Sequence, residues 1–260
     1  ETTTTLSPYS KPIENTTLNE QGLYLTHLNI ILASYQQIAQ DQKHFSLQEK
    51  ISHYLAEKTI SDPQKHVRSY IHLPHKWPAD QSATLYSLWK FDQQYNTTLS
   101  VQPINQWLEY MNNKATDHKT HLPYSNITGK SDGKIPRGCA LSWSIRYINF
   151  FAPQHAKTLW ANYKQSYYES SFFISGFREF PQGIDRKSDS DSGPIIQGIG
   201  VAASGFALPA SKVMNDRRTY RELEKSKSVA ETALNWSGHK KEINSPMATS
   251  IEFYTASLPL

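Results

Sequence analysis

Cysteine is nearly absent from this chain of 260 residues, in which Cys139 is the one example. An intramolecular disulfide is therefore impossible, which excludes the class of small secreted scaffolds held together by disulfides. Glycine is also sparse, at 11 residues, and proline is near its average share, at 14, and these numbers exclude collagen-like and low-complexity chains. Long apolar runs are missing too. No stretch approaches the roughly 20 residues that span a bilayer, so we expect no membrane-spanning segment.

Charge of one sign is not in large excess either. The 27 basic and 23 acidic residues leave a net charge of +4 and form no long basic run, so nucleic acid is not expected as a partner. Aromatic side chains are plentiful, with 6 Trp, 15 Tyr and 10 Phe, and this content excludes a wholly disordered chain. The length fits one large domain or two small ones.

The N-terminal residues differ in composition from the rest of the chain. Residues 1–16 are polar and contain two prolines, which predicts an extended arm or the stub of a linker. The chain begins at Glu1 rather than at methionine, which is compatible with prior removal of a signal peptide. A Thr/Ser/Pro stub often follows a cleaved signal or a membrane anchor, so the sequence favours an extracytoplasmic location, periplasmic or secreted.

The remaining residues, 17–260, have helical apolar spacing and little strand signal, which predicts a single all-α domain. Ser46 begins a capping box that ends at Glu49. The predicted helices cover 17–41, 47–58, 78–95, 104–112, 141–151, 153–168, 194–214 and 216–236. Short links within pairs of helices alternate with longer loops at 61–76, 114–136 and 171–193. This rhythm is typical of antiparallel helical hairpins, either curled into an (α/α) toroid or partial toroid with a mouth of long loops, or stacked as an open solenoid.

The first motif that could carry chemistry is WPADQ, which begins at Trp77. Asp80 falls in the first turn of a predicted helix, where the helix dipole stabilises a carboxylate without any functional role. The residues that follow on the same face are small: Ala83, Thr84 and Ser87. That face could line a cavity, with the Trp77 ring as a stacking wall for a sugar or an apolar substrate.

The second motif, PRGCALSW, places Arg137 two residues before Cys139 and close to a predicted helix start. A basic neighbour or a helix N-terminus is what converts a thiol into a nucleophile. A free cysteine is also a common buried apolar residue. Both interpretations stay open.

The third motif, GFREFP, holds Arg178 and Glu179 between aromatic residues. The two charges either pair with each other and fix a loop, or present a carboxylate with a shifted pKa to a cleft.

The fourth motif contains three acids, Asp185, Asp189 and Asp191, followed by Ser192. Clustered acids suggest calcium, but the spacing of an EF-hand is absent. Either Asp191 or Ser192 caps a helix that starts at Pro194, or a carboxylate lies at the mouth of the ring.

The run GIGVAA matches a loose dinucleotide fingerprint, but the preceding strand and the βαβ rhythm that such a site requires are missing. Gly198, Ala202 and Gly205 have the spacing of one helical face, which favours close helix packing. Metal signatures such as HExxH and CxxC are missing as well. We therefore predict neither a metal nor a cofactor.

Four segments together resemble a known family: WPADQ, PRGCALSWSIRYINFFAP, GFREFP and DSDSGPIIQGIGVAASGFAL, within residues 70–215. They are similar to the bacterial linalool dehydratase/isomerase-like domain, which falls in the six-hairpin (α/α) toroid group with many glycosidases. The resemblance implies a ring of helical hairpins whose inner mouth holds the polar motifs. The chain is short for six hairpins, so the resemblance implies an incomplete ring or one completed by an oligomer or a partner chain. The linalool enzyme's proposed site involves cysteine as well as acids, and Cys139 is the matching residue here.

The sequence leaves two functions open. The first is a hydrolase or lyase of the toroid type that acts on a glycan or a hydroxylated small molecule. Its acid–base pair would be Asp80 with either Glu179 or Asp191. The second is a non-catalytic helical module that binds a glycan, a peptide or a protein through the same mouth. The predicted ligand-binding residues are Tyr70, Trp77, Gln81, Cys139, Trp143, Phe177 and Arg178.

Overall fold

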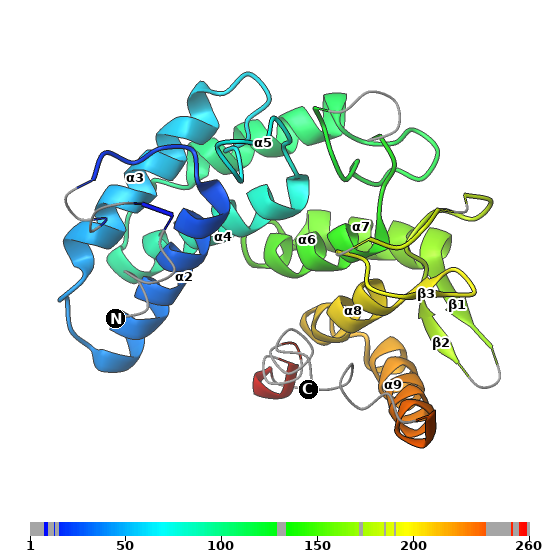
Figure 1. The fold of residues 1–260 in the computed structure, drawn as a ribbon. Helices are drawn as coiled ribbons and strands as arrows, with labels where there is room; N and C mark the ends of the chain where they lie inside the picture. The colour runs from blue at the N-terminus through cyan, green and yellow to red at the C-terminus, as the bar shows by residue number, and fades with distance from the viewer. Residues whose placement is uncertain are drawn as a thin grey trace. The chain divides into compact units, whose positions relative to one another are not determined.

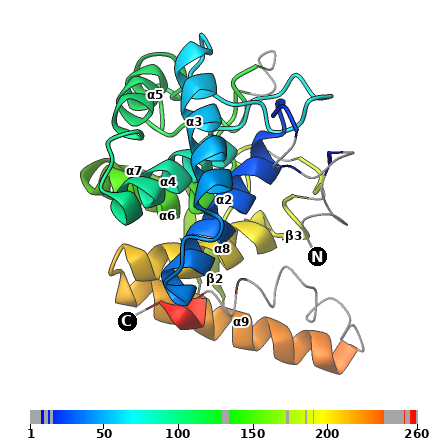
Figure 2. The same ribbon diagram turned by 90° about the vertical axis from the view of Figure 1, so that its left-hand side faces the viewer.

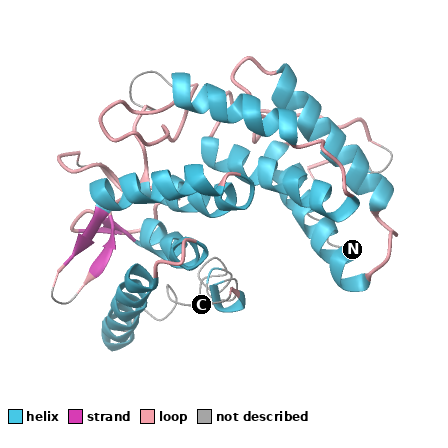
Figure 3. Cartoon of the chain, turned by 180° about the vertical axis from the view of Figure 1, so that it is seen from behind, coloured by secondary structure: helices cyan, strands magenta, loops and turns pink. Residues whose placement is uncertain are grey.

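The computed structural model describes residues 8–9, 13, 16–128, 134–171, 174–184, 186–189, 191–237, 251 and 255–258. Across these residues the chain is mostly helical with only short strands, which confirms the predicted all-α class (Figure 3). None of the helices in these ranges is both long and apolar enough to cross a membrane.

The chain divides into two compact units. The first unit comprises Glu1–Thr116 and Pro123–Lys134, and the second comprises Asp117–Leu122 and Ile135–Leu260. The single domain over residues 17–260 and the extended arm over residues 1–16 stay predictions, and most of the arm lies outside the described residues.

The first unit is built from two helical hairpins (Figure 1). Its helices are α2 (Gly22–Ala39), α3 (Phe45–Ser61), α4 (Pro78–Tyr95) and α5 (Val101–Lys114). The first helices of the two hairpins, α2 and α4, pack against each other, and so do the second helices, α3 and α5 (Figure 2).

The interface between α2 and α4 is made largely of small polar residues. The Thr26 and Thr84 hydroxyls lie 2.7 Å apart, and the Asn29 side-chain amide donates to Ser87 Oγ at 3.2 Å. Ala83 is 0% exposed beside them. The prediction that this small-residue face lines a cavity is therefore wrong, because α2 covers it.

The starts of α3 and α4 test two of the helix-start patterns that were read from the sequence. Pro78 occupies the first turn of α4 as predicted, because proline has no N–H to lose there. The predicted capping box at Ser46 is wrong, since His44 is the N-cap residue and makes no side-chain capping bond. Phe45 is the first residue of α3, and its ring packs edge-on against Tyr95 with centroids 4.8 Å apart.

The second unit contains two further hairpins and two small antiparallel sheets (Figure 1). Its elements are α6 (Gly138–Phe151), α7 (Pro153–Tyr167), β1 (Tyr168–Ser170), β2 (Ser175–Phe177), β3 (Ile195–Ile196), β4 (Ile199–Gly200), α8 (Val201–Val213) and α9 (Arg217–Ser237). Here too the first helices of the hairpins, α6 and α8, pack against each other.

The β3–β4 hairpin corrects the helix predicted over residues 194–214, because α8 begins only at Val201. Ile195 pairs with Gly200 and Ile196 with Ile199, which leaves a two-residue turn between the strands. Both turn residues, Gln197 and Gly198, have positive φ angles of 51° and 87°. This geometry is that of a type I′ turn, whose twist matches a hairpin. Gly198 therefore does not lie on a helical face with Ala202 and Gly205.

The core of the second unit is aromatic. Phe177 on β2 is 0% exposed and stacks on Tyr163 of α7 with ring centroids 4.4 Å apart. Trp160 on the same helix packs against Phe177 at 5.4 Å. Phe177, which was predicted to bind a ligand, thus lies in the core and anchors the strand that leads into Glu179.

Candidate functional site

Glu179 follows β2 at the point where three sequence motifs meet. Its backbone N–H donates to the Gly198 carbonyl oxygen at 3.1 Å, and its own carbonyl oxygen accepts from the Gly138 N–H at 2.9 Å. The β3–β4 turn and the start of α6 therefore hold it on two sides. A Cβ atom on Gly138 would lie 2.0 Å from the Arg178 carbonyl oxygen, so only glycine permits this close approach.

The Glu179 carboxylate is 0% exposed and has donors on both oxygens. The Arg137 Nε–H donates to Oε1 at 2.8 Å. The Cys139 backbone N–H donates to Oε2 at 3.1 Å, and the Cys139 thiol donates to Oε1 at 3.1 Å. Because the backbone donor belongs to the first turn of α6, the helix dipole adds to the attraction for a negative charge.

Arg137 bridges this buried carboxylate to a second one nearer the surface. Its Nη2 donates to Asp189 Oδ1 at 2.9 Å, and the Asp189 side chain is 48% exposed. The same Asp189 oxygen accepts the backbone N–H groups of Asp191 and Ser192, at 3.1 Å and 2.9 Å. The Arg137 guanidinium therefore pairs with one buried and one exposed carboxylate.

The two carboxyl groups on Arg137 have pKa shifts in opposite directions. Burial raises the pKa of Glu179 above its ordinary value, although the bonds from Cys139 and Arg137 oppose this shift. For Asp189, partial burial also raises the pKa, but the Arg137 guanidinium and the backbone N–H groups outweigh it and lower the pKa. Such divergence assigns acid and base roles in enzymes that use two carboxyl groups.

Cys139 has the opposite environment from an activated nucleophile. Burial raises the pKa of its thiol, the Glu179 charge raises it further, and Arg137 opposes both only in part. The thiol is 8% exposed and stays protonated at neutral pH, where it donates to Glu179. The Arg137-activated thiolate considered from the sequence is therefore wrong for this geometry.

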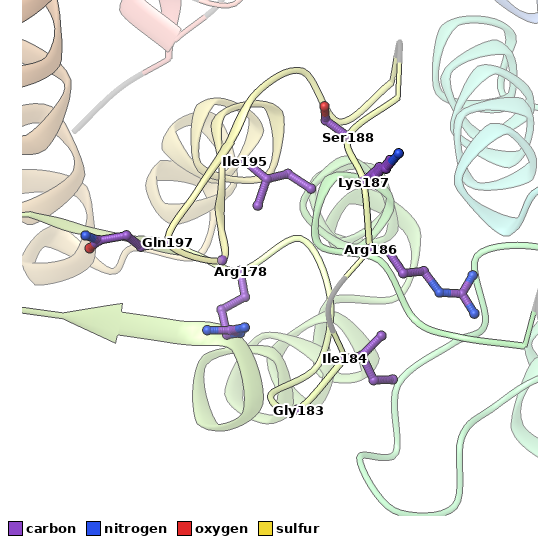
Figure 4. Close-up of a pocket in the computed structure, with 9 residues that line it drawn as sticks. Arg178, Gly183, Ile184, Arg186, Lys187, Ser188, Ile195 and Gln197 are labelled. Atoms are coloured by element: carbon purple, nitrogen blue, oxygen red, sulfur yellow. The ribbon is translucent and has the colours of Figure 1, made fainter.

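An open pocket of about 900 Å³ is lined by Arg178 and Ser188, the chain neighbours of Glu179 and Asp189, while neither carboxyl group is itself among the lining residues (Figure 4). The lining residues come from the end of β2, from residues 183–184 and 186–188, and from the β3–β4 hairpin. Figure 4 shows Ile195 pointing toward the segment that carries Lys187, and the Lys187 side chain pointing away from Ile195. The lining residues are Arg178, Gly183, Ile184, Arg186, Lys187, Ser188, Ile195, Gln197 and Gly198.

Two further predicted residues lie in the second unit. Arg178 donates to Glu169 Oε1 at 2.8 Å, so its ion pair is with Glu169 and not with its sequence neighbour Glu179. Trp143 on α6 has the Arg146 guanidinium 4.6 Å from its ring centroid. Arg178 reaches the pocket wall, whereas Trp143 is not among the residues that line it.

The WPADQ residues belong to the first unit. Asp80 Oδ2 accepts the Ser69 hydroxyl at 2.5 Å in the first turn of α4. The Trp77 ring lies edge-on to Tyr70 at 6.2 Å, and Tyr70 is 43% exposed. Gln81 is 1% exposed, and its amide joins the Val67 N–H at 2.8 Å to Thr59 Oγ1 at 3.0 Å. Gln81 therefore fixes the loop before α4 to α3.

The three acids of the fourth motif do not lie together in one site. Asp189 joins the cluster, and Asp191 follows it in an exposed turn. Asp185 lies outside the described residues. Neither Asp191 nor Ser192 caps a helix, because the β3–β4 hairpin intervenes before α8. In the described part of the chain, no group of three His, Cys, Asp or Glu side chains could hold a metal ion.

Sequence reasoning singled out Arg137 and Asp189 but did not assign either to the site. The signal was present in each case, since Arg137 is the one charged residue in PRGCALSW and Asp189 opens the DSDSGP segment. Their contact spans 52 positions of the sequence and could not be read from spacing alone.

No protein-family model matches this chain, and no curated protein matches its sequence. The likeness to the linalool dehydratase/isomerase-like domain therefore stays a hypothesis based on the four motifs.

Proposed function

We propose that the chain is an acid–base enzyme of the (α/α) toroid type that acts on a glycan or a hydroxylated small molecule. The observation that carries the proposal is the pair of carboxyl groups on Arg137, whose pKa values shift in opposite directions. Glu179, with the raised pKa, is the general acid. Asp189, with the lowered pKa, is the base. It takes the place of Asp80, which the sequence paired with either Glu179 or Asp191 and which belongs to the first unit.

The same two roles serve both reaction classes under consideration. In glycoside hydrolysis the acid protonates the leaving oxygen, and the ionised carboxylate activates water or attacks the sugar carbon. In the dehydration of an alcohol the acid protonates the departing hydroxyl and the base removes a proton from the neighbouring carbon. The pocket offers Arg178, Ser188 and Gln197 as hydrogen-bonding groups for hydroxyls.

Access is the step that the proposal has to explain, because the Glu179 carboxyl is 0% exposed. Arg137 is 19% exposed on its side chain and its second partner, Asp189, is 48% exposed. A ligand that competes for the Arg137 guanidinium would open the cluster from this side. Substrate binding and exposure of the acid are then one event.

Turnover tests the proposal directly. Wild-type protein is assayed against a panel of aryl glycosides and of secondary and tertiary alcohols, beside Glu179→Gln and Asp189→Asn. The control is Glu224→Gln, which makes the same charge change on α9 of the same unit. We expect each site variant to lower kcat by at least about 100-fold on the best substrate, and the control to leave it unchanged. Activity that survives in both site variants would refute the proposal.

A binding module is the second candidate, and one observation favours it. Each oxygen of Glu179 already has a donor within the protein, as in a carboxylate that fixes a loop. In that case ligands that bind the wild type would bind Glu179→Gln equally well, and no member of the panel would be turned over.

The proposed partial toroid rests on hairpin packing. Each unit holds two hairpins whose first helices lie together, α2 with α4 and α6 with α8. A completing chain, whether a second copy or a partner, would supply the remaining hairpins. Light scattering of the purified chain tests for a second copy, which would double the molar mass of 29.7 kDa.

A further inference from the structure

The first unit contains a second pocket that the proposed enzyme does not use. It has a volume of about 540 Å³ and opens between α3 and the C-terminal end of α4. Its lining residues are all described, and they come from the α2–α3 link, α3, α4 and the loop after α4. They are Gln42, Phe45, Glu49, His53, Phe91, Tyr95, Thr97, Thr98 and Leu99.

Three aromatic rings form one side of this pocket and meet at steep angles. The Phe45 and Tyr95 centroids lie 4.8 Å apart with planes at 71°, and those of Phe91 and Tyr95 lie 4.8 Å apart at 53°. Phe91 is 3% exposed, so the accessible ring surface comes mainly from Phe45 and Tyr95, which meet as a corner rather than as a flat stack. The Tyr95 hydroxyl lies 3.0 Å from both Gln36 Oε1 and Gln48 Oε1, which holds the shared ring in place.

The charged side of the pocket is acidic. Glu49 and His53 are one turn apart on α3 and so share a face of the helix. Within the described residues, Glu49 makes no hydrogen bond or ion pair. The nine lining residues include no lysine and no arginine. Glu49 therefore lines the pocket without a lysine or arginine beside it in the wall.

We propose that this pocket binds an organic cation, specifically a quaternary or alkylated ammonium group. The faces of aromatic rings carry negative partial charge and attract ammonium groups, and quaternary ammonium ligands are recognised by aromatic boxes of this kind. Glu49 supplies the counter-charge. A neutral sugar could donate hydroxyl hydrogen bonds to Glu49 but would leave its charge unneutralised, whereas an ammonium group supplies the opposite charge. This site is independent of the Glu179 cluster.

Choline and its uncharged isostere 3,3-dimethylbutan-1-ol test the proposal, because they share shape and differ in charge. Both are titrated into the full chain by NMR, with wild type, Glu49→Gln and the control Glu57→Gln. Glu57 lies on the same helix, is exposed where Glu49 is half-buried, and is not among the pocket residues. We expect choline to bind the wild type at least about 5-fold more tightly than the isostere. Glu49→Gln should remove most of that preference, and Glu57→Gln should keep it.

Phe45→Leu provides a second variant that removes one wall of the box and keeps an apolar residue in the helix. It should weaken choline by a similar factor of about 5 while the fold, followed by the remaining resonances, is unchanged. Three results would overturn the proposal. They are equal affinity for choline and the isostere, no choline binding up to about 100 mM, or a methyl glycoside that binds this pocket as tightly as choline does.

Discussion

The buried imidazole of His66 leads to a prediction about how stability depends on pH. His66 lies in the loop between α3 and α4, is 2% exposed and packs beneath Trp107 of α5. Its Nδ1 is 2.6 Å from the Gln64 carbonyl oxygen, and its Nε2 is 3.2 Å from the Trp107 indole nitrogen. The indole N–H can only donate, so Nε2 accepts and Nδ1 carries the proton. A second proton at Nε2 would face the indole N–H directly.

Burial lowers the pKa of His66 from 6.5 to about 4, although the Gln64 carbonyl and the Asp62 charge both raise it. The folded pKa lies below the unfolded one, so the unfolded chain takes up the proton first as the pH falls. The contribution to stability is therefore complete above pH 6.5 and is lost between pH 6.5 and about 4. A difference of about 2.5 units (6.5 minus 4) corresponds to about 3 kcal/mol in total.

Urea unfolding at pH 7 and pH 5 measures this loss in wild type and in His66→Gln. The wild type should lose about 2 kcal/mol more than the variant between these pH values, because most of the titration window lies between them. His72→Gln, an exposed neighbour in the same loop, is the control and should behave as wild type. The reasoning is refuted if His66 titrates near 6.5 by NMR in the folded protein, or if the wild type and His66→Gln lose stability in parallel.

Three substitutions and one chemical modification test the second unit. Gly138→Ala should destabilise by at least about 2 kcal/mol in thermal unfolding, because its Cβ would lie 2.0 Å from a carbonyl oxygen. Gly205→Ala inside α8 meets only an atom at 3.9 Å and should stabilise by about 0.5–1 kcal/mol, so equal effects at the two glycines would contradict the geometry. Partial burial raises the pKa of Asp216, but the hydrogen bond from Lys164 outweighs it and lowers the pKa to about 2. Asp216→Asn should therefore lower the free energy of unfolding by about 1 kcal/mol at neutral pH. That cost should vanish as the pH falls from about 4 to 2, and its persistence at pH 2 would argue against the ion pair. Cys139 should react with iodoacetamide far more slowly in the folded chain than in urea, and equal rates would rule out its burial.

The helices were predictable because their determinants are local. Proline in the first turn marks the starts of α4 and α7, and apolar spacing marks their buried faces. The segment at 195–200 was not predictable in the same way. Its apolar and small residues fit a helix by composition, but Ile199 bridges to Arg178 of another segment. That long-range pairing, together with the positive φ angles at Gln197 and Gly198, favours a β-hairpin over a helix in this segment.

In the site too, the sequence indicated which residues matter but not which residues they contact. The motifs contained every residue of the cluster, but the Arg178–Glu179 pair considered from their adjacency does not form. Successive side chains of an extended segment point to opposite sides. Arg178 therefore reaches Glu169 on one side, while Glu179 reaches Arg137, 42 positions away, on the other.

Burial of the Glu179 carboxylate also bears on why the cluster is ionic at all. Removing two charges from water costs several kcal/mol for each ion, and apolar side chains of similar volume would fix a loop at least as well. The Glu179–Arg137 pair is 0% and 19% exposed on its two side chains, so its attraction has to offset that cost. A purely structural role gives no reason to extend the network to the exposed carboxylate of Asp189 beside an open pocket. The acid–base function that we propose would give that reason, because proton transfer needs one group that donates and another that accepts.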